Sequence, residues 1–547
     1  MINQSANVAP MNHVTTNNRV VIEVNNVKSR ILFNPEIYTE NFQQCLKAID
    51  AKLAFLLPNA ENNKNYNTIL ADGSRLWDGK RHLFNSFTHN KYGLMPFEFY
   101  TGKIKTVLET LYRFGFRAAT DDRRIRHPLH LNSWEWNPKK IPYDYQEGAI
   151  TNAVRVGRGI LQVATGGGKT LIGAAIIHRL GLSPFIFFVT SRDLLYQAHD
   201  AFTEALQTDV GVIGDGKCDI RAINVCTIQT CVSAFGKESD YLEQCRQMQK
   251  YGEEVIIDKK EAKVDTSRHA EIRELIRTCK GIIFDEVHHL ASDTCSMILE
   301  LCDNAFYRFG LGATVKRDDG MDPLIEALLG EYLCDITASF LIKKGRLIPP
   351  HIYMIPSENY EGECESYSSE YKTYITHNKA RNNAIVKTAQ KAIAAKISTL
   401  ILVKHIEHGA LLKEQIEGSV FIQGAITAKK RKEIIQKVRN GELFCILATS
   451  LADEGLDIVC LECLILAGSG KSIVKAMQRV GRVLRPDPEN LNKRAIVIDF
   501  MDGSQYLHSH ALKRKKLYTS EPEFKVYDMR YKNQIQKAIQ SQQDLFA

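Results

Sequence analysis

The chain has 547 residues, which is too long for one ordinary hydrophobic core and predicts about three domains at roughly 150 residues each. Hydrophobic residues make up 44% of it and charged residues 24%, a composition typical of folded globular proteins and not of disordered ones. The longest apolar runs, such as TLILV from Thr399, are too short to cross a membrane, so we expect no membrane partner. A net charge of +8 suits a polyanionic partner without requiring one.

The amino-terminal residues are polar and lack the basic segment and apolar core of a secretory signal, so we expect a cytoplasmic protein. The 13 cysteines are scattered, apart from Cys460 and Cys463, and no second pair completes a metal site. We therefore expect buried free thiols.

Residues 1–140 are predicted to form a small α+β domain, with a strand at RVVIEV and a helical stretch over residues 42–57. In RLWDGKRHLFN, Trp77 lies close to Lys80 and Arg81. Two interpretations are open: these side chains bind nucleic acid, or the stretch is a hairpin with one packed face.

Residues 141–335 repeat a strand-then-helix pattern, which predicts a parallel sheet flanked by helices with its chemistry at the carboxyl ends of the strands. The charged stretch 236–280 interrupts the pattern and is expected to be a surface insertion. Residues 346–505 repeat the pattern, and 506–547 are expected to form a basic C-terminal extension with a solvated helix.

The stretch VATGGGKT lies between an apolar run and a helical segment, which is the context of a phosphate-binding loop. A plain loop is the alternative, because Val163 occupies the place of the first motif glycine. In the phosphate-binding interpretation, Lys169 reaches the outer phosphates and Thr170 binds Mg²⁺. The expected cradle residues are Thr165, Gly166, Gly167, Gly168, Lys169 and Thr170.

The stretch IIFDEVHHL predicts a buried strand that ends in Asp285 and Glu286, and buried carboxylates need a cation. Asp285 is predicted to hold Mg²⁺ and Glu286 to act as the general base. His288 has either a structural role or, because it lies near the end of the sheet, a coupling role.

The stretch QRVGRVLR predicts a helix on which Arg482 and Arg485 share one face and Gln478 shares a face with Arg482. A helix surface that carries several arginines is commonly exposed to solvent and has no catalytic role. If the third unit closes on the second, the two arginines would instead act as arginine fingers on the transferring phosphoryl group.

Together with LGAT and ATSLADEGLDI, these motifs resemble superfamily 2 helicases in order and spacing, within the DExH branch that contains XPB, restriction-enzyme motors and phage UvsW branch-migration helicases. The stretch around LWDGKRHLF is similar to the small N-terminal domain of UvsW-like proteins. The resemblance implies an α/β fold of two tandem RecA-like parallel-sheet motor domains preceded by a small α+β domain, with ATP and Mg²⁺ as cofactors.

The resemblance also implies roles for single residues. Gln146, beside Tyr145, would read adenine, and Gly455 and Asp457 would contact the nucleotide. Thr314, with His288, would couple the ATP state to the grip on DNA. The implied strand-tracking residues are Thr190, Arg192, Thr227 and Gln229 in the first motor domain and Gly424 and Thr449 in the second.

The function implied is an ATP-dependent DNA helicase or translocase that grips branched or duplex DNA, and RNA–DNA hybrids, through the backbone with little sequence preference. Its expected task is fork regression, Holliday-junction branch migration and R-loop unwinding in phage recombination, replication and repair, in the host cytosol. Three alternatives remain open: a restriction-type duplex-DNA translocase subunit, a viral transcript-release factor, and a clamp that uses ATP only to lock onto DNA.

Overall fold

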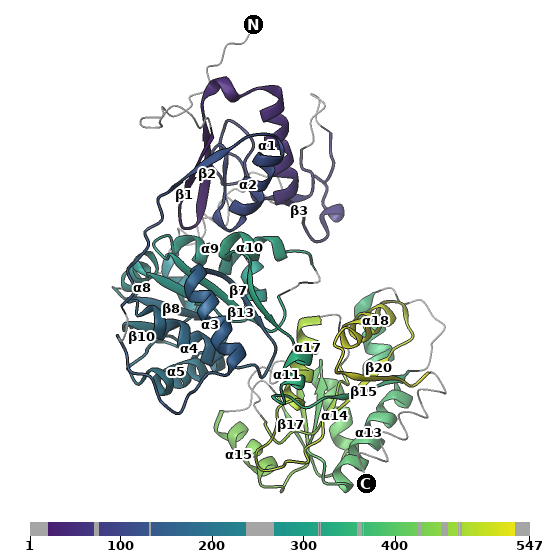
Figure 1. The fold of residues 1–547 in the computed structure, drawn as a ribbon. Helices are drawn as coiled ribbons and strands as arrows, with labels where there is room; N and C mark the ends of the chain where they lie inside the picture. Colours follow the sequence, from purple (N-terminus) through teal and green to yellow (C-terminus); the bar gives the residue numbers. More distant parts are fainter. Residues whose placement is uncertain are drawn as a thin grey trace. The chain divides into compact units, whose positions relative to one another are not determined.

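The structure is a computed structural model, in which the chain divides into two compact units (Figure 1). One unit contains residues 1–162 and 169–335, and the other contains residues 163–168 and 336–547. Within the described residues, no helix is long and apolar enough to cross a membrane. The structure describes residues 20–69, 76–130, 133–236, 267–315, 317, 319–357, 364, 366–423, 428–449, 458–468, 470 and 473–530.

The N-terminal part of the first unit is a four-stranded sheet with two helices. The strand predicted at RVVIEV is present as β1, which pairs antiparallel with β2 and parallel with β6. The helix predicted over residues 42–57 is shorter, because the chain turns into strand β3 at Ala54 and pairs with β4. The sheet order is β5-β2-β1-β6. The bounds are β1 Val20–Val24, β2 Lys28–Phe33, α1 Glu40–Leu53, β3 Ala54–Leu56, β4 Lys80–His82, β5 Glu98–Tyr100, α2 Ile104–Arg113 and β6 Ala118–Asp122.

The rest of the first unit, which we call the first lobe, is built on an eight-stranded sheet of order β10-β9-β11-β8-β12-β13-β7-β14. Its central strands pair in parallel and are buried along their whole length, as the apolar runs FIFFV, INVCT and GIIF predict. Helices α3, α4 and α5 pack side by side in one layer, and α6, α8, α9 and α10 contact one another in a second (Figure 1). The bounds are α3 Asp144–Val156, β7 Arg158–Val163, α4 Lys169–Leu180, β8 Phe185–Val189, α5 Arg192–Leu206, β9 Gly211–Gly214, β10 Lys217–Asp219, β11 Ile223–Thr227, α6 Ile228–Phe235, α8 Ser267–Thr278, β12 Gly281–Phe284, α9 Asp293–Leu301, β13 Tyr307–Gly312, α10 Asp322–Leu329 and β14 Tyr332–Ile336.

The N-terminal sheet and the first lobe share one continuous hydrophobic core. Polar contacts reinforce this junction: the Tyr100 hydroxyl donates to Glu300 Oε1 at 2.9 Å, and Lys103 forms an ion pair with Glu326. Gly102 lies so close to the carbonyl of Glu326 that a Cβ would collide with it. The N-terminal domain is therefore packed on the first lobe as part of the same unit.

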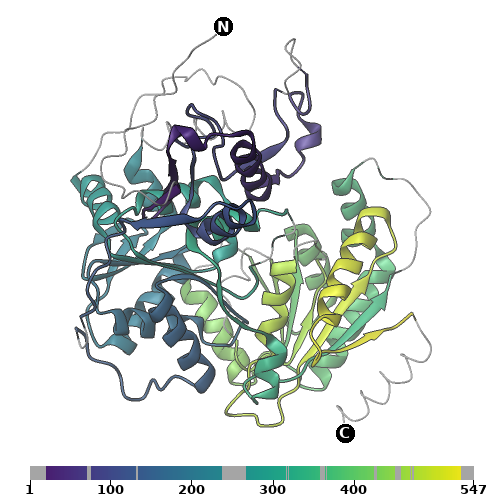
Figure 2. The same ribbon diagram turned by 45° about the horizontal axis from the view of Figure 1, so that its top comes forward.

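The second unit contains a seven-stranded sheet of order β17-β18-β16-β19-β20-β15-β21, and every pair of neighbouring strands is parallel. Helices α13 and α14 contact one another and the sheet, and α17 and α18 form a separate contacting pair; Figure 2 shows helices on both faces. We call this sheet and its helices the second lobe. The bounds are α11 Ala338–Lys343, β15 His351–Pro356, α12 Tyr367–Tyr371, α13 Lys379–Ala394, β16 Thr399–Val403, α14 Ile406–Gln415, β17 Ser419–Ile422, α15 Ala428–Arg439, β18 Cys445–Thr449, β19 Cys463–Ile465, α17 Ile473–Val483, β20 Ile496–Met501, α18 Gln505–Thr519 and β21 Lys525–Asp528.

The segment expected to be a basic extension from residue 506 is integrated in the second lobe. Strand β21 pairs with β15 at the sheet edge, and α18 packs on β20. Arg514 and Tyr518 of α18 are buried and both bind Asp499 of β20. The helix is therefore not a solvated tail, and residue 505 does not mark an edge of the fold.

Two further expectations concern exposed chain and thiols. Of the stretch 236–280, the structure describes α8 and its flanks, while residues 237–266 lie outside the described residues. The described cysteines are all free, and most are buried, as the composition predicts. Cys463 lies in β19 and Cys460 is half-buried, so this pair belongs to the packing of the second lobe.

Candidate nucleotide and nucleic-acid sites

The predicted phosphate-binding loop connects β7 to α4, in the strand-loop-helix order that the sequence predicts. Val163 ends the strand and Lys169 begins the helix. Gly166 and Gly168 have positive φ values of 87° and 84°, which side chains rarely adopt, and a Cβ on Gly167 would come 2.6 Å from the side chain of Val163. The backbone conformation thus favours glycine at positions 166 and 168, and the close approach of the Val163 side chain favours it at position 167. A loop of this kind directs backbone N–H groups to an anion at the start of α4.

The two predicted carboxylates follow β12 at the carboxyl edge of the same sheet. The Glu286 N–H donates to Asp285 Oδ1 at 3.0 Å, and Glu286 Oε1 lies 3.9 Å from Lys169 Nζ. Glu286 itself has a left-handed backbone with φ 50°, which is uncommon for a residue with a side chain and is typical of functional sites. The structure therefore brings Lys169, Asp285 and Glu286 together.

The electrostatics of this cluster fit a divalent cation. Burial, and after it the negative charge of Glu286, raises the pKa of Asp285 well above its ordinary value, although Lys169 opposes the shift. A carboxyl group in this setting stays charged only with a further cation beside it. Thr170, the second residue of α4, supplies a half-buried hydroxyl, and Thr165 lies in the loop, also half-buried. The donor set of Thr170 and Asp285 fits Mg²⁺ bound with phosphate oxygens and water.

The predicted coupling residues lie just after two neighbouring strands, β12 and β13. His288 Nδ1 lies 3.5 Å from Glu286 Oε2, so Glu286 lies between Lys169 and His288. The carbonyl of His288 also accepts a hydrogen bond from Arg317. Thr314 is half-buried two residues after β13, the strand next to β12. His288 thus contacts the general-base candidate directly, and the coupling role of Thr314 stays a prediction.

The predicted adenine-reading residue stabilises the start of α3. Gln146 is 2% exposed, and its Oε1 accepts the N–H of Tyr143 at 2.8 Å in a capping box. The ring of Tyr145 stacks on that of Tyr143 with centroids 5.9 Å apart. The capping bond accounts for Gln146 structurally, and its contact with adenine stays a prediction.

The predicted strand-tracking residues of the first lobe gather at the carboxyl edge of its sheet. Thr190 follows β8 and Thr227 ends β11, and these strands are neighbours in the sheet. Gln229 Nε2 donates to the carbonyl of Thr190 at 3.1 Å. Arg192 begins α5, is exposed, and pairs with Asp215 at 2.9 Å. This edge is the one that carries Asp285 and Glu286.

The N-terminal stretch with Trp77 favours the packed-hairpin interpretation. Trp77 is 7% exposed and belongs to the core, so its ring is not available for stacking on a base. Arg81 binds Asp293 of the first lobe at 3.3 Å. Lys80 is exposed and remains the one candidate of the three for contact with nucleic acid.

The predicted residues of the second lobe are described in part. Thr449 ends β18 and is buried, and its hydroxyl makes no hydrogen bond within the described residues. Gln478 and Arg482 lie on α17, but the helix ends at Val483, so Arg485 lies beyond it and the two arginines do not share a helix face as predicted. The remaining residues, Gly424, Gly455 and Asp457, lie outside the described residues.

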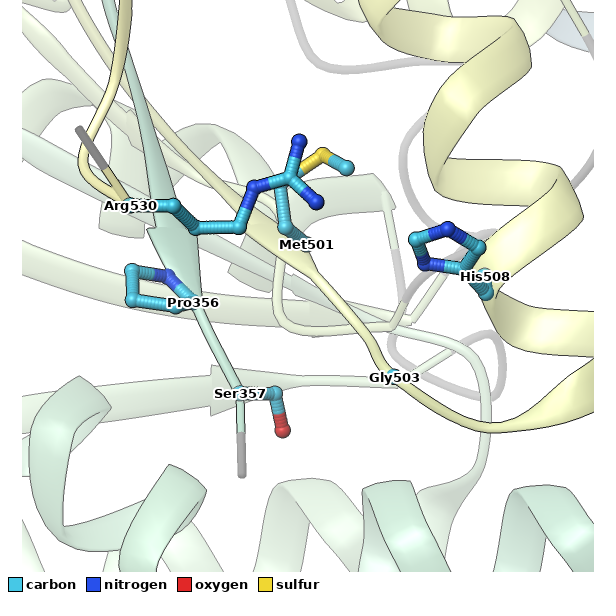
Figure 3. A pocket seen from close by; sticks show the side chains of 6 residues that line it. All are labelled: Pro356, Ser357, Met501, Gly503, His508 and Arg530. Atoms are coloured by element: carbon cyan, nitrogen blue, oxygen red, sulfur yellow. The ribbon is translucent and has the colours of Figure 1, made fainter. Parts of the chain in front are cut away.

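A cavity of about 370 Å³ lies in the second lobe, at the carboxyl ends of β15 and β20. Figure 3 shows Arg530 and Met501 on one side of it and His508, on α18, on the other. Arg530 is paired with Asp528, and His508 Nδ1 lies 3.0 Å from the carbonyl of Asp502. The cavity contains none of the predicted site residues.

Two groups of residues in the structure were not predicted from sequence motifs. Asp215, which binds Arg192 and the Tyr196 hydroxyl, lies in a turn with φ 52°, and the dipeptide Asp-Gly was its only signal. A group of tyrosines and histidines around Lys404 in the second lobe was also missed, because its members are spread over about 140 residues of sequence.

Two family models match the chain, one over most of the first lobe and the other over most of the second. The model described as type III restriction enzyme, res subunit, matches residues 139–317, and the helicase conserved C-terminal domain matches residues 371–487. The DNA 3'-5' translocase XPB2 of Sulfurisphaera tokodaii is 24% identical over 65% of this chain and 81% of its own length. The ATP-dependent DNA helicase uvsW of Enterobacteria phage T4 is 24% identical over 80% of this chain and 84% of its own.

The chain is a superfamily 2 helicase of the XPB/UvsW-like branch. Its fold agrees with that of a fragment described as an HsdR subunit of a type I restriction enzyme from Vibrio vulnificus, with a TM-score of 0.50, 18% identity, and coverage of 72% of this chain and 70% of that one. The predicted fold class of tandem RecA-like sheets is confirmed. This helicase is an enzyme that hydrolyses ATP.

Proposed function

We propose that this helicase is an ATP-dependent DNA motor that remodels branched DNA, by fork regression, branch migration of four-way junctions and removal of RNA from R-loops. The observation that carries the proposal is the carboxyl edge of the first-lobe sheet. Asp285, Glu286 and Lys169 are close together there, and Thr190, Thr227 and Gln229 lie at the ends of neighbouring strands. A conformational change at the nucleotide can thus be transmitted to the predicted DNA-contacting residues through adjacent β-strands of one rigid sheet.

The residues of the site have distinct roles in this proposal. The loop from Thr165 to Gly168 and Lys169 bind and orient the phosphates of ATP, and Thr170 and Asp285 hold Mg²⁺, which supplies positive charge beside the phosphate oxygens. Glu286 accepts the proton of the attacking water on a carboxylate oxygen.

The second lobe contributes the remaining groups. Arg482 and Arg485 stabilise negative charge on the transferring phosphoryl group, while Gly455 and Asp457 contact the nucleotide. Thr449 and Gly424 grip the DNA backbone. Because such contacts are made to phosphates, affinity for DNA falls steeply with salt and depends little on base sequence.

Branch remodelling is preferred to three other functions. The likeness to the phage helicase uvsW extends over most of both chains, and a basic chain with backbone contacts suits a substrate of several DNA arms. A restriction-type translocase would act equally on unbranched duplex, a transcript-release factor would act through RNA polymerase, and an ATP-gated clamp would not need hydrolysis.

The test is migration of a labelled four-way junction by the wild-type protein and by Glu286→Gln. We expect the wild type to resolve the junction into duplexes only with ATP and Mg²⁺, and Glu286→Gln to bind the junction without moving it. Full junction migration by Glu286→Gln would exclude a motor driven by ATP hydrolysis, and ATP-dependent binding without migration by the wild type would favour the clamp. Equal ATPase stimulation by linear duplex and junction would favour the translocase, and ATP-dependent release of transcripts from stalled polymerase without junction migration would favour the release factor.

A further inference from the structure

An aromatic and basic cluster lies at the carboxyl edge of the second-lobe sheet, and none of its residues is among the predicted site residues. Its centre is Tyr367 of α12, whose ring centroid lies 6.0 Å from that of Tyr371, 6.3 Å from Tyr506 and 5.4 Å from His510. Lys404 Nζ lies 4.9 Å from the Tyr367 ring centroid. We call Tyr367, Tyr506, His510, Lys404 and His405 the aromatic platform.

The platform is accessible. Tyr506 is 43% exposed, and Lys404 and His405, which follow β16, are both exposed. Aromatic rings are usually buried in a core, and here Tyr371 alone is, with its hydroxyl donating to the carbonyl of Gly468 at 2.8 Å. Tyr371 thus anchors the cluster and leaves the outer rings at the surface.

The platform is also held rigidly. The carboxylate of Glu370 is buried and accepts the backbone N–H groups of Tyr506 and Leu507 at 3.0 and 3.3 Å. This contact holds α12 against the first turn of α18. The free N–H groups at the N-terminus of α18 thus bind a carboxylate of the protein itself. The rings are therefore positioned before any ligand arrives, which lowers the entropic cost of binding.

The charge around the platform is positive. Among the nearby acids, Asp502 forms a buried pair with Arg381 at 3.1 Å and Glu370 is satisfied by backbone N–H groups, while the exposed Glu407 lies 3.2 Å from His377. The exposed side of α18 continues from Tyr506 with Lys513 and Lys516, which form no ion pair within the described residues. A ligand on the rings would thus meet cations at Lys404 and along α18.

The platform lies beside a predicted DNA contact. Val403, directly before Lys404, is level with Thr449 in the parallel pairing of β16 with β18. Thr449 is one of the two strand-tracking candidates of this lobe. Aromatic faces with cations at a backbone-tracking edge are the chemistry that binds single-stranded nucleic acid, by base stacking and by contact with phosphates.

We propose that the aromatic platform binds an unpaired segment of DNA, with a base stacked on Tyr506 and the adjoining phosphates near Lys404 and Lys513. This site rests on the proposed DNA motor function and extends it. The backbone contacts of the motor grip any strand, whereas stacking is available only to bases released from a duplex. The platform therefore selects DNA that has already been opened, as at a junction or a fork.

The test uses single-stranded DNA that carries 2-aminopurine and a terminal fluorophore. For Tyr506→Ala we expect binding about five- to a hundredfold weaker and loss of the 2-aminopurine quenching that stacking produces. Tyr506→Phe keeps the ring and should retain both. For Lys513→Gln, the slope of log K against log salt should become shallower by about 0.7.

Tyr112→Ala is the matched control, because Tyr112 is 73% exposed on α2 of the N-terminal domain, and it should bind DNA as the wild type does. The melting temperature of each variant verifies folding. If Tyr506→Ala binds DNA and quenches 2-aminopurine as the wild type does, the platform proposal is wrong and the proposed motor function stands. The same holds if the substitution changes self-association and leaves DNA binding unchanged. Failure of the wild type to bind any DNA would overturn the proposed function as well.

Discussion

Glu286 is the residue whose role is most sharply defined, because its carboxylate lies between Lys169 and His288. Substitution by Gln keeps the shape of the side chain and removes the proton acceptor. We expect ATP hydrolysis by Glu286→Gln to fall about 10²- to 10⁴-fold with nucleotide binding retained. Steady-state hydrolysis and titration with a fluorescent ATP analogue measure the two quantities; an equal loss of both would assign Glu286 to binding.

His82 predicts a pH dependence of stability in the N-terminal domain. Burial alone would lower its pKa, but hydrogen bonds and charges from Asp50 and Asp78 outweigh burial and raise the pKa to about 9. Since the unfolded value is about 6.5, the stabilisation is complete below pH 6.5 and is lost as the pH rises through 9.

We therefore expect the melting temperature of the wild type to decline between pH 7 and pH 9.5 through this contribution. In His82→Gln the decline should be smaller, because a neutral amide does not titrate. Thermal unfolding at several pH values measures it. The same decline in both proteins would mean that His82 is not the group responsible.

The sequence predicted single residues best where a local backbone demands them. The glycines of the phosphate loop and the DEVH carboxylates were predicted, because their spacing alone implies a strand, a loop and a helix. Trp77 shows the limit. Whether an aromatic ring among basic residues is buried depends on the core it meets, and that core includes strands far away in the sequence.

Helix α18 illustrates why whole elements can be misjudged. The basic run from Lys513 to Lys516 gives no sign that Arg514 is 3% exposed and Lys515 is paired, because their partners Asp499 and Asp528 lie in separate strands. Only long-range pairing of β20 and β21 with β15 brings these acids under the helix.

Removing the cation of this buried pair should weaken the second lobe. In Arg514→Met, Asp499 keeps the Tyr518 hydroxyl but loses its charge partner, and we expect a loss of about 3–5 kcal/mol of unfolding free energy. Urea unfolding measures it. Lys513→Met, an exposed neighbour, should change stability by no more than about 0.5 kcal/mol; equal effects of the two substitutions would contradict the buried pair.

Across the first unit, the N-terminal domain and the first lobe behave as one body because they share a core and close backbone contacts at Gly102. We expect calorimetry to show a single unfolding transition for this unit in the wild type. Gly102→Leu would force the backbone away from Glu326 and should split off an earlier transition of the N-terminal domain.

Gly148→Ala is the matched control, because Gly148 lies in α3 with no atom near the position of a Cβ. That substitution should stabilise the lobe by about 0.5–1 kcal/mol and leave the number of transitions unchanged. A wild type that already unfolds in separate N-terminal and lobe transitions would contradict the shared core.

For the whole molecule, the alternation of strands and helices predicted two parallel sheets, and the motif order predicted the family. The order of the strands could not be predicted. Strands β15 and β21 are the first and last strands of the second lobe in sequence, yet they are neighbours at one end of its sheet. The aromatic platform was equally invisible, because α12, β16 and α18 meet only after folding.

The most direct test of the central claim is ATP hydrolysis by the wild type and by Lys169→Ala, each alone and with single-stranded DNA, linear duplex, four-way junctions and single-stranded RNA. We predict the strongest stimulation of the wild type by four-way junctions and no stimulated hydrolysis in Lys169→Ala. Hydrolysis that no DNA stimulates, or that persists in Lys169→Ala, would contradict a DNA motor driven from this site.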